Sequence, residues 1–394
     1  MVESMYLELE TVTPLFMDGA DQKRPEIRAA SIKGVMRWWW RAVAGNIYAI
    51  DDMRYKESEI FGGAVKRGEK VEKIKSPTLL DIGDINFKKT NVCVKPKKTS
   101  KKPYFNDRID YLLFSTIRCI KDENIKEFIN TGANFRLNIS FRQFKNGLSM
   151  EELKRQVFAS LWLMTYLGGI GSRSRRGAGS LCVKNGNKIS DISFESNFKD
   201  KQELIAFLSD GLGDICRYKK MEYNDHSIVN PSTANIFLGS EHSNWEDAMT
   251  ELGMWYVGVR RGRKFAGGFR TSGDIPDYNL SHDIKNKSVG EGPYDENRVY
   301  LGLPINYYFQ ETRSGATLSV ENYDRRASPI LFGVYKLSEA KYVPRVVVFD
   351  TLFLPKFNGK IKIKSKSTAI SVRNDVIKLA INDLIEKGWE EVRW

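Results

Sequence analysis

Apolar and polar residues alternate along two segments of the first half of the chain, residues 5–12 and 133–144. Alternation with a period of two is typical of half-buried β-strands. After the first segment, Ser31 can cap a helix whose apolar residues recur at helical spacing. After the second segment, Ser149 and Glu152 have the spacing of a capping box, which predicts the start of another helix. The first half is therefore predicted to alternate strands and helices.

A glycine- and arginine-rich run ends the second of these helices. It reads Gly-Gly-Ile-Gly-Ser-Arg-Ser-Arg-Arg-Gly-Ala-Gly over residues 168–179, and residues 180–184 then predict another strand. Short, mostly antiparallel strands in this order are typical of a ferredoxin-like α+β sandwich. The second half has helical patterns near residues 201–208, 244–257 and 372–386 between apolar runs. It predicts a second α+β domain.

The length of 394 residues predicts two domains, each large enough to bury its own core. We place the N-terminal domain at residues 1–185 and the C-terminal domain at residues 186–394. Within the first, the pattern weakens and lysine accumulates over residues 51–103. This segment predicts an insertion that ends in an exposed loop or hairpin tip.

Positive charge is concentrated in the first domain. The net charge is +13, and residues 1–185 contain 33 Lys and Arg against 21 Asp and Glu, whereas the remaining residues contain 29 against 28. A field concentrated in this way indicates a polyanionic ligand bound mainly by the N-terminal domain. Nucleic acid is the first candidate, and an anionic membrane surface is the second.

Several classes of protein do not fit the sequence. The N-terminus is acidic and alternating, unlike a signal peptide, and no apolar stretch approaches the length of a membrane span. We therefore expect a cytoplasmic protein. The four cysteines form no C-x-x-C pair, which argues against a zinc site or a disulfide framework. We expect no metal and no cofactor.

The helix after Ser31 carries a row of cations. Lys33, Arg37 and Arg41 recur every fourth residue on a face other than the apolar one. Trp38 and Trp40 lie on either edge of the apolar stripe, because three consecutive tryptophans span about 200° of a helical wheel and cannot all be buried. Aromatic surface beside a cationic row is suited to base stacking and phosphate contact. A solvated helix face or a subunit interface would show the same residues.

The glycine- and arginine-rich run over residues 168–179 is a second candidate for phosphate binding. Glycine allows a backbone to adopt positive φ and to approach a ligand closely, and arginine offers a rigid fork of donors that matches phosphate oxygens. Glycine-rich turns also end helices for purely local reasons. The three arginines and the basic charge of the domain favour the phosphate-binding interpretation.

Two further basic clusters are secondary candidates for contact with a nucleic-acid backbone. One is the lysine-rich tip of the predicted insertion, and the other is an arginine- and glycine-rich segment of the second domain, where Phe265 and Phe269 are interleaved. Each could equally be a solvated loop. Their cations are Lys97, Lys98, Lys101 and Lys102 in the first cluster, and Arg260, Arg261, Arg263, Lys264 and Arg270 in the second.

The order of these motifs resembles the CRISPR-associated RAMP superfamily. The resemblance is carried by residues 13–21, by the segment from Arg28 to Arg41 with its Ser-x-Lys-Gly helix start, and by the run over residues 168–177. Residues 301–304 and 326–329 resemble the second half of the family more weakly. Within the superfamily, the motifs are most similar to the first-numbered subunits of type III-B Cmr effector complexes.

This resemblance implies a pair of RRM-like ferredoxin folds that bind single-stranded RNA. It implies contact with the CRISPR RNA, toward its 3′ end, or with target RNA, and it implies neighbouring RAMP subunits as protein partners in antiviral defence. The family's subunit of this kind is not regarded as the nuclease. Carried over residue by residue, the resemblance assigns RNA contact to Arg28, Lys33, Arg37, Arg41, Gly169, Gly171, Arg173, Arg175, Arg176 and Gly177.

The main alternative is a metal-independent endoribonuclease that processes CRISPR RNA. Such cleavage commonly uses a histidine, or a lysine and a tyrosine with shifted pKa values. The three histidines, His226, His242 and His282, all lie outside the two basic motifs, and no Asp, Glu and His cluster has metal-ligand spacing. We therefore predict binding without catalysis. A regulator of messenger RNA outside any CRISPR system fits the charge but not the order of motifs.

Overall fold

The computed structural model describes most of the chain, and all structural statements below concern the described residues. These are residues 2–21, 24–86, 92–94, 105–117, 127–142, 147–216, 226–261, 278–295, 297–309, 311–320, 325–351, 360–363, 366–372 and 375–394. Among their helices, none is long and apolar enough to cross a membrane. The fold is α+β with several sheets that pair almost entirely antiparallel, as predicted.

A four-stranded antiparallel sheet with two helices forms the first unit. Its elements follow the chain as β1 (Val2–Thr11), α1 (Ala29–Ala44), β4 (Thr78–Asn86), β7 (Asn134–Arg142), α4 (Met150–Tyr166) and β8 (Leu181–Val183). The strands lie in the order β4-β7-β1-β8. Alternate residues of β7 are buried, and the Ser149 hydroxyl accepts a hydrogen bond from the Glu152 N–H, so the predicted strand and helix start are confirmed.

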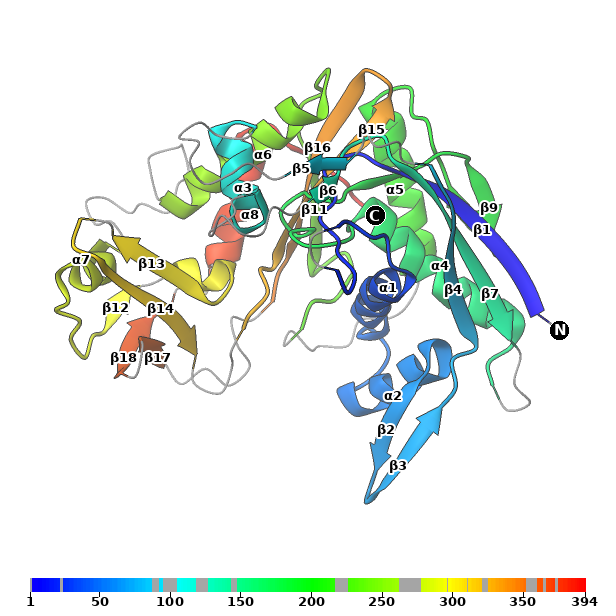
Figure 1. The fold of residues 1–394 in the computed structure, drawn as a ribbon, viewed down its shortest axis with the longest axis horizontal. Helices are drawn as coiled ribbons and strands as arrows, with labels where there is room; N and C mark the ends of the chain where they lie inside the picture. Colours follow the sequence, from blue (N-terminus) through cyan, green and yellow to red (C-terminus); the bar gives the residue numbers. More distant parts are fainter. Residues whose placement is uncertain are drawn as a thin grey trace.

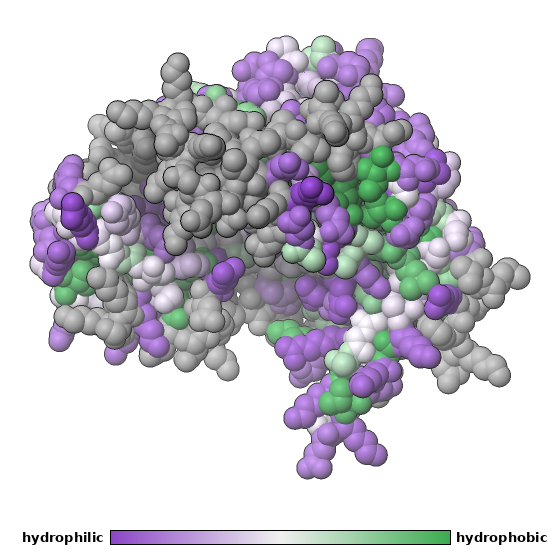
Figure 2. Space-filling view, viewed as in Figure 1, coloured by the Kyte–Doolittle hydropathy of each residue, from purple (hydrophilic) through white to green (hydrophobic). Residues whose placement is uncertain are grey.

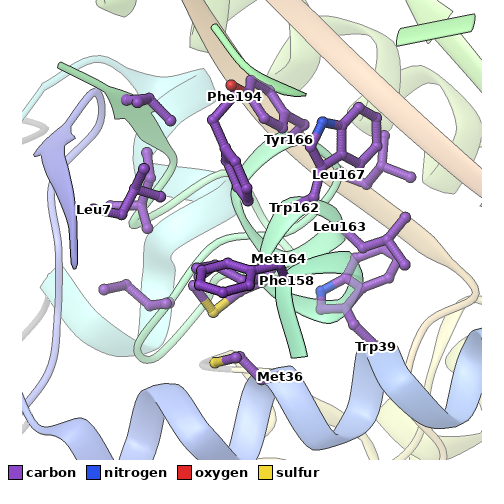
Figure 3. Close-up of a cluster of buried hydrophobic side chains, with 14 of the residues drawn as sticks. Leu7, Met36, Trp39, Phe158, Trp162, Leu163, Met164, Tyr166, Leu167 and Phe194 are labelled. Atoms are coloured by element: carbon purple, nitrogen blue, oxygen red, sulfur yellow. The ribbon is translucent and has the colours of Figure 1, made fainter. Parts of the chain in front are cut away.

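The core of this unit lies where α1 and α4 pack on the sheet. Figure 3 shows Met36 and Trp39 of α1 approaching Phe158 and Leu163 of α4, with Leu7 of β1 nearby. The hairpin of β9 (Asn187–Ile189) and β10 (Ile192–Phe194) and the helix α5 (Lys201–Ile215) add to the same core. The basic face of α1 is thus held by a rigid body of aromatic and aliphatic side chains.

The segment predicted as an insertion is only partly peripheral. Helix α2 (Ile50–Phe61) and the hairpin of β2 (Gly63–Arg67) and β3 (Lys70–Ile74) project from the body in Figure 1, but β4 pairs with β7 as an edge strand of the main sheet. Asp81, Gly83 and Asp84 interrupt its apolar pattern, and an edge strand tolerates such residues. Farther along lie β5 (Val92–Val94), α3 (Asp107–Ile117) and β6 (Glu127–Ile129).

The second unit repeats the connectivity of the first. It runs β11 (Ala234–Leu238), α6 (Trp245–Arg261), β15 (Ile330–Ser338), β16 (Lys341–Phe349), α8 (Val376–Glu386) and β19 (Glu390–Glu391), with strand order β15-β16-β11-β19. When the four strands of each unit are numbered 1 to 4 along the chain, both sheets have the strand order 2-3-1-4. Hydrophobic periodicity alone did not reveal this repetition.

A five-stranded sheet forms a separate lobe in Figure 1. Three of its strands come from the part of the chain between α6 and β15, and two come from the part between β16 and α8. Its strand order is β12-β18-β17-β14-β13, and β12 pairs with β18 in parallel. The sequence did not predict it. The elements are α7 (Tyr278–Asn286), β12 (Tyr294–Asp295), a 3₁₀ helix (Asn297–Leu301), β13 (Ile305–Phe309), β14 (Ser314–Val320), β17 (Lys360–Ile363) and β18 (Lys366–Ser371).

A buried arginine joins the two units. Arg345 of β16 is 1% exposed, and its guanidinium donates to the carbonyl oxygens of Tyr166 and Gly168 at the end of α4. Its path crosses Gly333 on the neighbouring strand β15, where a Cβ atom would lie within 2.0 Å of the guanidinium nitrogen. The cation therefore lies at the negative end of the α4 dipole.

A carboxylate joins the units a second time. Glu10 of β1 is buried and accepts hydrogen bonds of 2.8 Å from Lys184, beside β8, and from Lys336 of β15. Burial raises the pKa of Glu10, but the two ammonium groups outweigh burial, so the pKa lies below its ordinary value. The two units therefore share both packing and ion pairs.

We predict that Arg345→Met lowers the free energy of unfolding by about 3 kcal/mol, because two buried carbonyl groups lose their donors. Urea denaturation followed by far-UV circular dichroism measures the change. Arg393→Met is the control, because that side chain is 89% exposed and should change stability by less than about 0.5 kcal/mol. Equal midpoints for the two variants would contradict the role given to Arg345.

Candidate nucleic-acid interface

Helix α1 begins earlier than predicted. Arg28, rather than Ser31, is the N-cap, and no side chain caps the helix. The backbone N–H of Arg28 donates to the Met17 sulfur, so the chain enters the helix against the loop that follows β1. The Arg28 side chain is exposed, and the first turn contains no acidic residue. This end of α1 therefore presents positive charge and unpaired N–H groups.

Two arginines of the predicted row share one carboxylate. Arg37 Nε lies 2.5 Å and an Arg41 terminal nitrogen 2.7 Å from the same Oε1 atom of Glu57, on α2. The Glu57 side chain is 6% exposed, whereas those of Arg37 and Arg41 are 33% and 40% exposed. Because one carboxylate balances only one of two cations, the group keeps a net positive charge on its accessible side.

Lys33, the third member of the row, is bound by a different segment, at the start of β4. Its ammonium group donates to Ser76 Oγ at 2.7 Å, just before β4, and to the carbonyl of Thr78, the first residue of β4, at 2.9 Å. Burial and then the nearby Arg37 cation lower its pKa to about 8. Lys33 therefore titrates close to neutral pH.

Gly34 makes an opening in the same surface. It lies inside α1 and is exposed, and a Cβ atom added there would meet nothing within 4 Å. Glycine costs about 1 kcal/mol relative to alanine in a helix interior. Packing among the residues that the structure describes does not explain this glycine, whereas close approach of a ligand would.

The three tryptophans are arranged differently from the prediction. Trp39 is fully buried, and Trp40 is 5% exposed and donates its indole N–H to Gln156 of α4 at 2.8 Å. The predicted exposure of Trp40 is wrong, because α4 covers a second side of α1. Trp38 is half-buried and packs edge-on against Trp39 and Phe349.

Three glycines of the 168–179 run are required by the local backbone and its packing. Gly171 has a φ of 82°, and a Cβ atom there would lie 2.6 Å from the Phe16 carbonyl. Gly177 has a φ of 90°, and its Cβ atom would lie 2.6 Å from the Met249 sulfur of α6. A Cβ atom on Gly169 would be 2.9 Å from another backbone carbonyl of the run. Close packing accounts for all three glycines, and their predicted contact with RNA stays a prediction.

The arginines of this run differ in accessibility. Arg173 is exposed at a φ of 63°. The Arg175 guanidinium lies over the Trp38 ring, 4.6 Å from its centroid, and donates to the Ser328 carbonyl at 2.9 Å. Burial and then Arg176 lower the pKa of Arg175 to about 10. This stacking places the loop beside the basic face of α1, as the hypothesis of one surface requires.

Arg176 lies deeper than predicted. Its guanidinium is 4.3 Å from the ring centroid of Tyr256, on α6, and contacts the Phe332 ring and the Leu301 carbonyl. Among the described residues, no carboxylate pairs with Arg175, Arg176 or Arg260. Arg176 is therefore a link to the second unit and does not lie on the open surface.

Two arginines that sequence reasoning did not single out lie near this link. Arg326 lies over the Tyr300 ring, and Arg298 over the Tyr307 ring. The Arg-Ala-Ser-Pro segment at 326–329 was a signal for the first, because the resemblance included it. Local sequence around Arg298 gave no comparable signal.

Most of the secondary candidates lie outside the described residues. These are Lys97, Lys98, Lys101, Lys102, Arg263, Lys264 and Arg270. Arg260 lies in the last turn of α6 and approaches Tyr256, with a nitrogen 3.4 Å from the hydroxyl oxygen. Only the backbone of Arg261 is described.

The described residues contain no cluster of three or more His, Cys, Asp or Glu side chains that could hold a metal ion. His226 lies at the C-terminal end of α1, because a Cβ atom added at the cap residue Gly45 would be 2.5 Å from its Nε2 atom. His242 is 2.5 Å from Glu251, and His282 contacts its neighbour Asp283.

A family model described as the RAMP superfamily matches residues 8–182. The chain is 35% identical over 196 residues to the CRISPR system Cmr subunit Cmr1-2 of Pyrococcus furiosus, covering 47% of this chain and 96% of that protein. It is 25% identical over 365 residues to Cmr1-1 of the same organism, covering 90% and 89%. The crystal structure of apo Cmr1 from P. furiosus is similar in fold, with a TM-score of 0.58 and 17% identity over 100% and 99% of the two chains.

We predict that the Lys33 ammonium titrates with a midpoint near pH 8 and that Arg37→Met raises this midpoint, because one neighbouring cation is removed. NMR of selectively labelled lysine side chains measures both values. Because folding lowers the pKa of Lys33, the free energy of unfolding rises with pH between about pH 8 and the ordinary lysine pKa. In this range Lys33 stays protonated only in the unfolded chain. The Lys188→Met variant identifies the NMR signal of Lys188, an exposed lysine that serves as the reference. A Lys33 midpoint near pH 10.5 would contradict the prediction.

Proposed function

Because the chain belongs to the Cmr1 family of the RAMP superfamily, we propose that it is an RNA-binding subunit, without catalysis of its own, of a type III-B CRISPR effector complex. Its RNA ligand is the CRISPR RNA, toward the 3′ end, or target RNA, and its protein partners are neighbouring RAMP subunits. We further infer that both units are ferredoxin-like domains, because each has the same strand order around two helices.

The pairing of Arg37 and Arg41 with a single carboxylate carries this proposal. Glu57 orients both guanidinium groups from the buried side and leaves one positive charge uncompensated. Orientation before binding reduces the entropy lost when a ligand is held. A phosphate group on the exposed side would be the third partner that balances the charge, and guanidinium groups fit phosphate oxygens well.

The stacking of Arg175 on Trp38 supports one continuous surface for the RNA strand. It connects the 168–179 run to α1, and Arg28 before α1 and Arg173 in the run are exposed cations. Figure 2 shows a hollow between the projecting α2 and β2–β3 segment and the lobe of β13 and β14, with hydrophilic residues at its back. A phosphate backbone along this hollow would bind through charge rather than through base identity.

Lys33 keeps the runner-up function in consideration. A lysine with a pKa of about 8 can act as a general base at neutral pH, as metal-independent RNA cleavage requires. Its ammonium group, however, already donates to Ser76 and Thr78, which favours a role in orienting α1. We therefore keep the RAMP-type endoribonuclease as the second candidate only.

We predict that Gly34→Ala stabilises the chain by about 1 kcal/mol and weakens binding of single-stranded RNA at least tenfold, because the added methyl group blocks close approach of the strand. Fluorescence anisotropy with a labelled oligonucleotide measures affinity, and thermal unfolding measures stability. Gly213→Ala is the matched control, since Gly213 is also an exposed glycine inside a helix with open space at its Cβ position.

Gly213→Ala should give the same gain in stability and leave RNA affinity unchanged. If both alanine variants bind RNA as tightly as the parent chain, α1 is not the RNA-binding surface. A loss of affinity in both variants would instead point to helix rigidity rather than to a local contact.

We predict that the isolated protein leaves labelled single-stranded RNA uncut, both with Mg²⁺ and with EDTA. The sequence places no histidine beside Lys33, and its ammonium group contacts the Ser76 hydroxyl and the Thr78 carbonyl, neither of which serves as the second member of an acid–base pair. Gel analysis over several hours measures the remaining substrate. Cleavage by the parent chain that Lys33→Met abolishes would replace this proposal with the endoribonuclease function.

A further inference from the structure

A pocket of about 440 Å³ opens on the second unit, on a face of α6 that the proposed RNA site does not use. It lies between α6, the loop after β11 and the turn that follows α8. This volume is in the range of ligand-binding pockets. The lining residues are His242, Asp247, Thr250, Glu251, Met254, Trp255, Lys387 and Trp389.

The two faces of α6 have opposite chemical character. Met249 and Tyr256 face the 168–179 run, where Tyr256 contacts Arg176. Asp247, Glu251 and Met254 are about half a helical turn away and line the pocket. One helix thus presents an aromatic face to arginines on one side and carboxylates to solvent on the other.

The pocket has an excess of negative charge. Lys387, its one lysine, is paired with Asp383 at 2.9 Å, and the other Asp383 oxygen accepts the Trp255 indole N–H at 2.8 Å. Asp247 and Glu251 lie four residues apart on one helix, where like charges repel. Asp247 accepts a hydrogen bond from the Asn244 amide, and Glu251 accepts one from the Ser240 N–H, so neither of these contacts supplies a positive charge. The imidazole of His242 touches only one of these two carboxylates, Glu251.

Apolar and aromatic groups form the remaining wall. Trp255 and Trp389 are largely buried around the base of the pocket, and the Met254 side chain is exposed at its rim. Indole rings attract cations, guanidinium groups most often, and a flexible thioether adapts to a flat neighbour. The wall therefore suits a flat organic cation better than a hydrated metal ion, which requires several oxygen ligands.

We propose that this pocket binds an arginine side chain of a partner protein. A guanidinium group supplies planar stacking against the tryptophans and forked donors for Glu251 and Asp247. Arginine and tryptophan are both enriched at the centres of protein interfaces. RNA does not fit, because its phosphates would meet two carboxylates.

The inference is independent of RNA binding, since it concerns the RNA-free chain. The probe is the capped tripeptide acetyl-Gly-Arg-Gly-amide, titrated into the ¹⁵N-labelled full chain while the indole N–H signals are followed by NMR. The signal that disappears in Trp389→Phe identifies the pocket. We expect a saturable shift of this signal with the arginine peptide and at least tenfold weaker binding of the citrulline peptide, which has the same shape but no charge.

Variants separate the pocket from general electrostatics. Glu251→Gln should weaken binding at least tenfold, whereas Glu246→Gln, on the same helix but outside the pocket, should change it less than twofold. Met254→Arg places a guanidinium at the rim and should abolish binding without removing a carboxylate. An unfolding curve confirms that each variant is folded.

Three outcomes would overturn the proposal. The first is equal binding of the arginine and citrulline peptides, or no shift with either. The second is unchanged binding in both Glu251→Gln and Met254→Arg. The third is displacement of the arginine peptide by oligouridylate, which would make the pocket part of an RNA site instead of a protein interface.

Discussion

The contact of Arg345 with the end of α4 determines how the two units are arranged. A guanidinium group with 1% exposure loses its hydration, and the carbonyl groups of Tyr166 and Gly168 replace part of it. These carbonyls belong to the helix end, so the cation also interacts with the negative end of the helix dipole. Gly333 must lack a side chain for the guanidinium to pass. The contact therefore fixes β15 and β16 against the residue at which the glycine- and arginine-rich run begins.

The position of that run follows from this contact. Phe332 of β15 donates its N–H to the Arg175 carbonyl, and the Thr13 hydroxyl donates to the Gly177 carbonyl. The run is thus held between the loop after β1 and the second unit, and its glycines are needed where backbones approach closely. Arg175 then extends over Trp38. The segment that the sequence indicates as a candidate for phosphate binding is also packed between the two units, and only part of its charge lies at the surface.

The sequence predicted the elements whose pattern is local and strongly periodic. The strand β7 and the capping box of α4 follow from residues close together in the chain. The sequence did not predict β4, because Asp81 and Gly83 break its alternation of apolar and polar residues. An edge strand tolerates such residues. For the site, the spacing of Arg37 and Arg41 predicted a common face. The spacing could not predict that both arginines pair with Glu57, because the position of Glu57 depends on how a different helix, α2, packs. The burial of Arg176 likewise depends on residues far along the chain.

The distribution of charge separates two kinds of contact. On α1, two arginines compete for one buried carboxylate, so that face attracts an additional anion. On the outer face of α6, the pocket's lysine is paired with Asp383, and Asp247 and Glu251 contact Asn244, Ser240 and His242, so that face keeps negative charge. A strand of nucleic acid is repelled from the second face by the same charges that suit it to arginine. The basic face of α1 and the acidic pocket of α6 are therefore separate surfaces, and the net charge of +13 conceals this division.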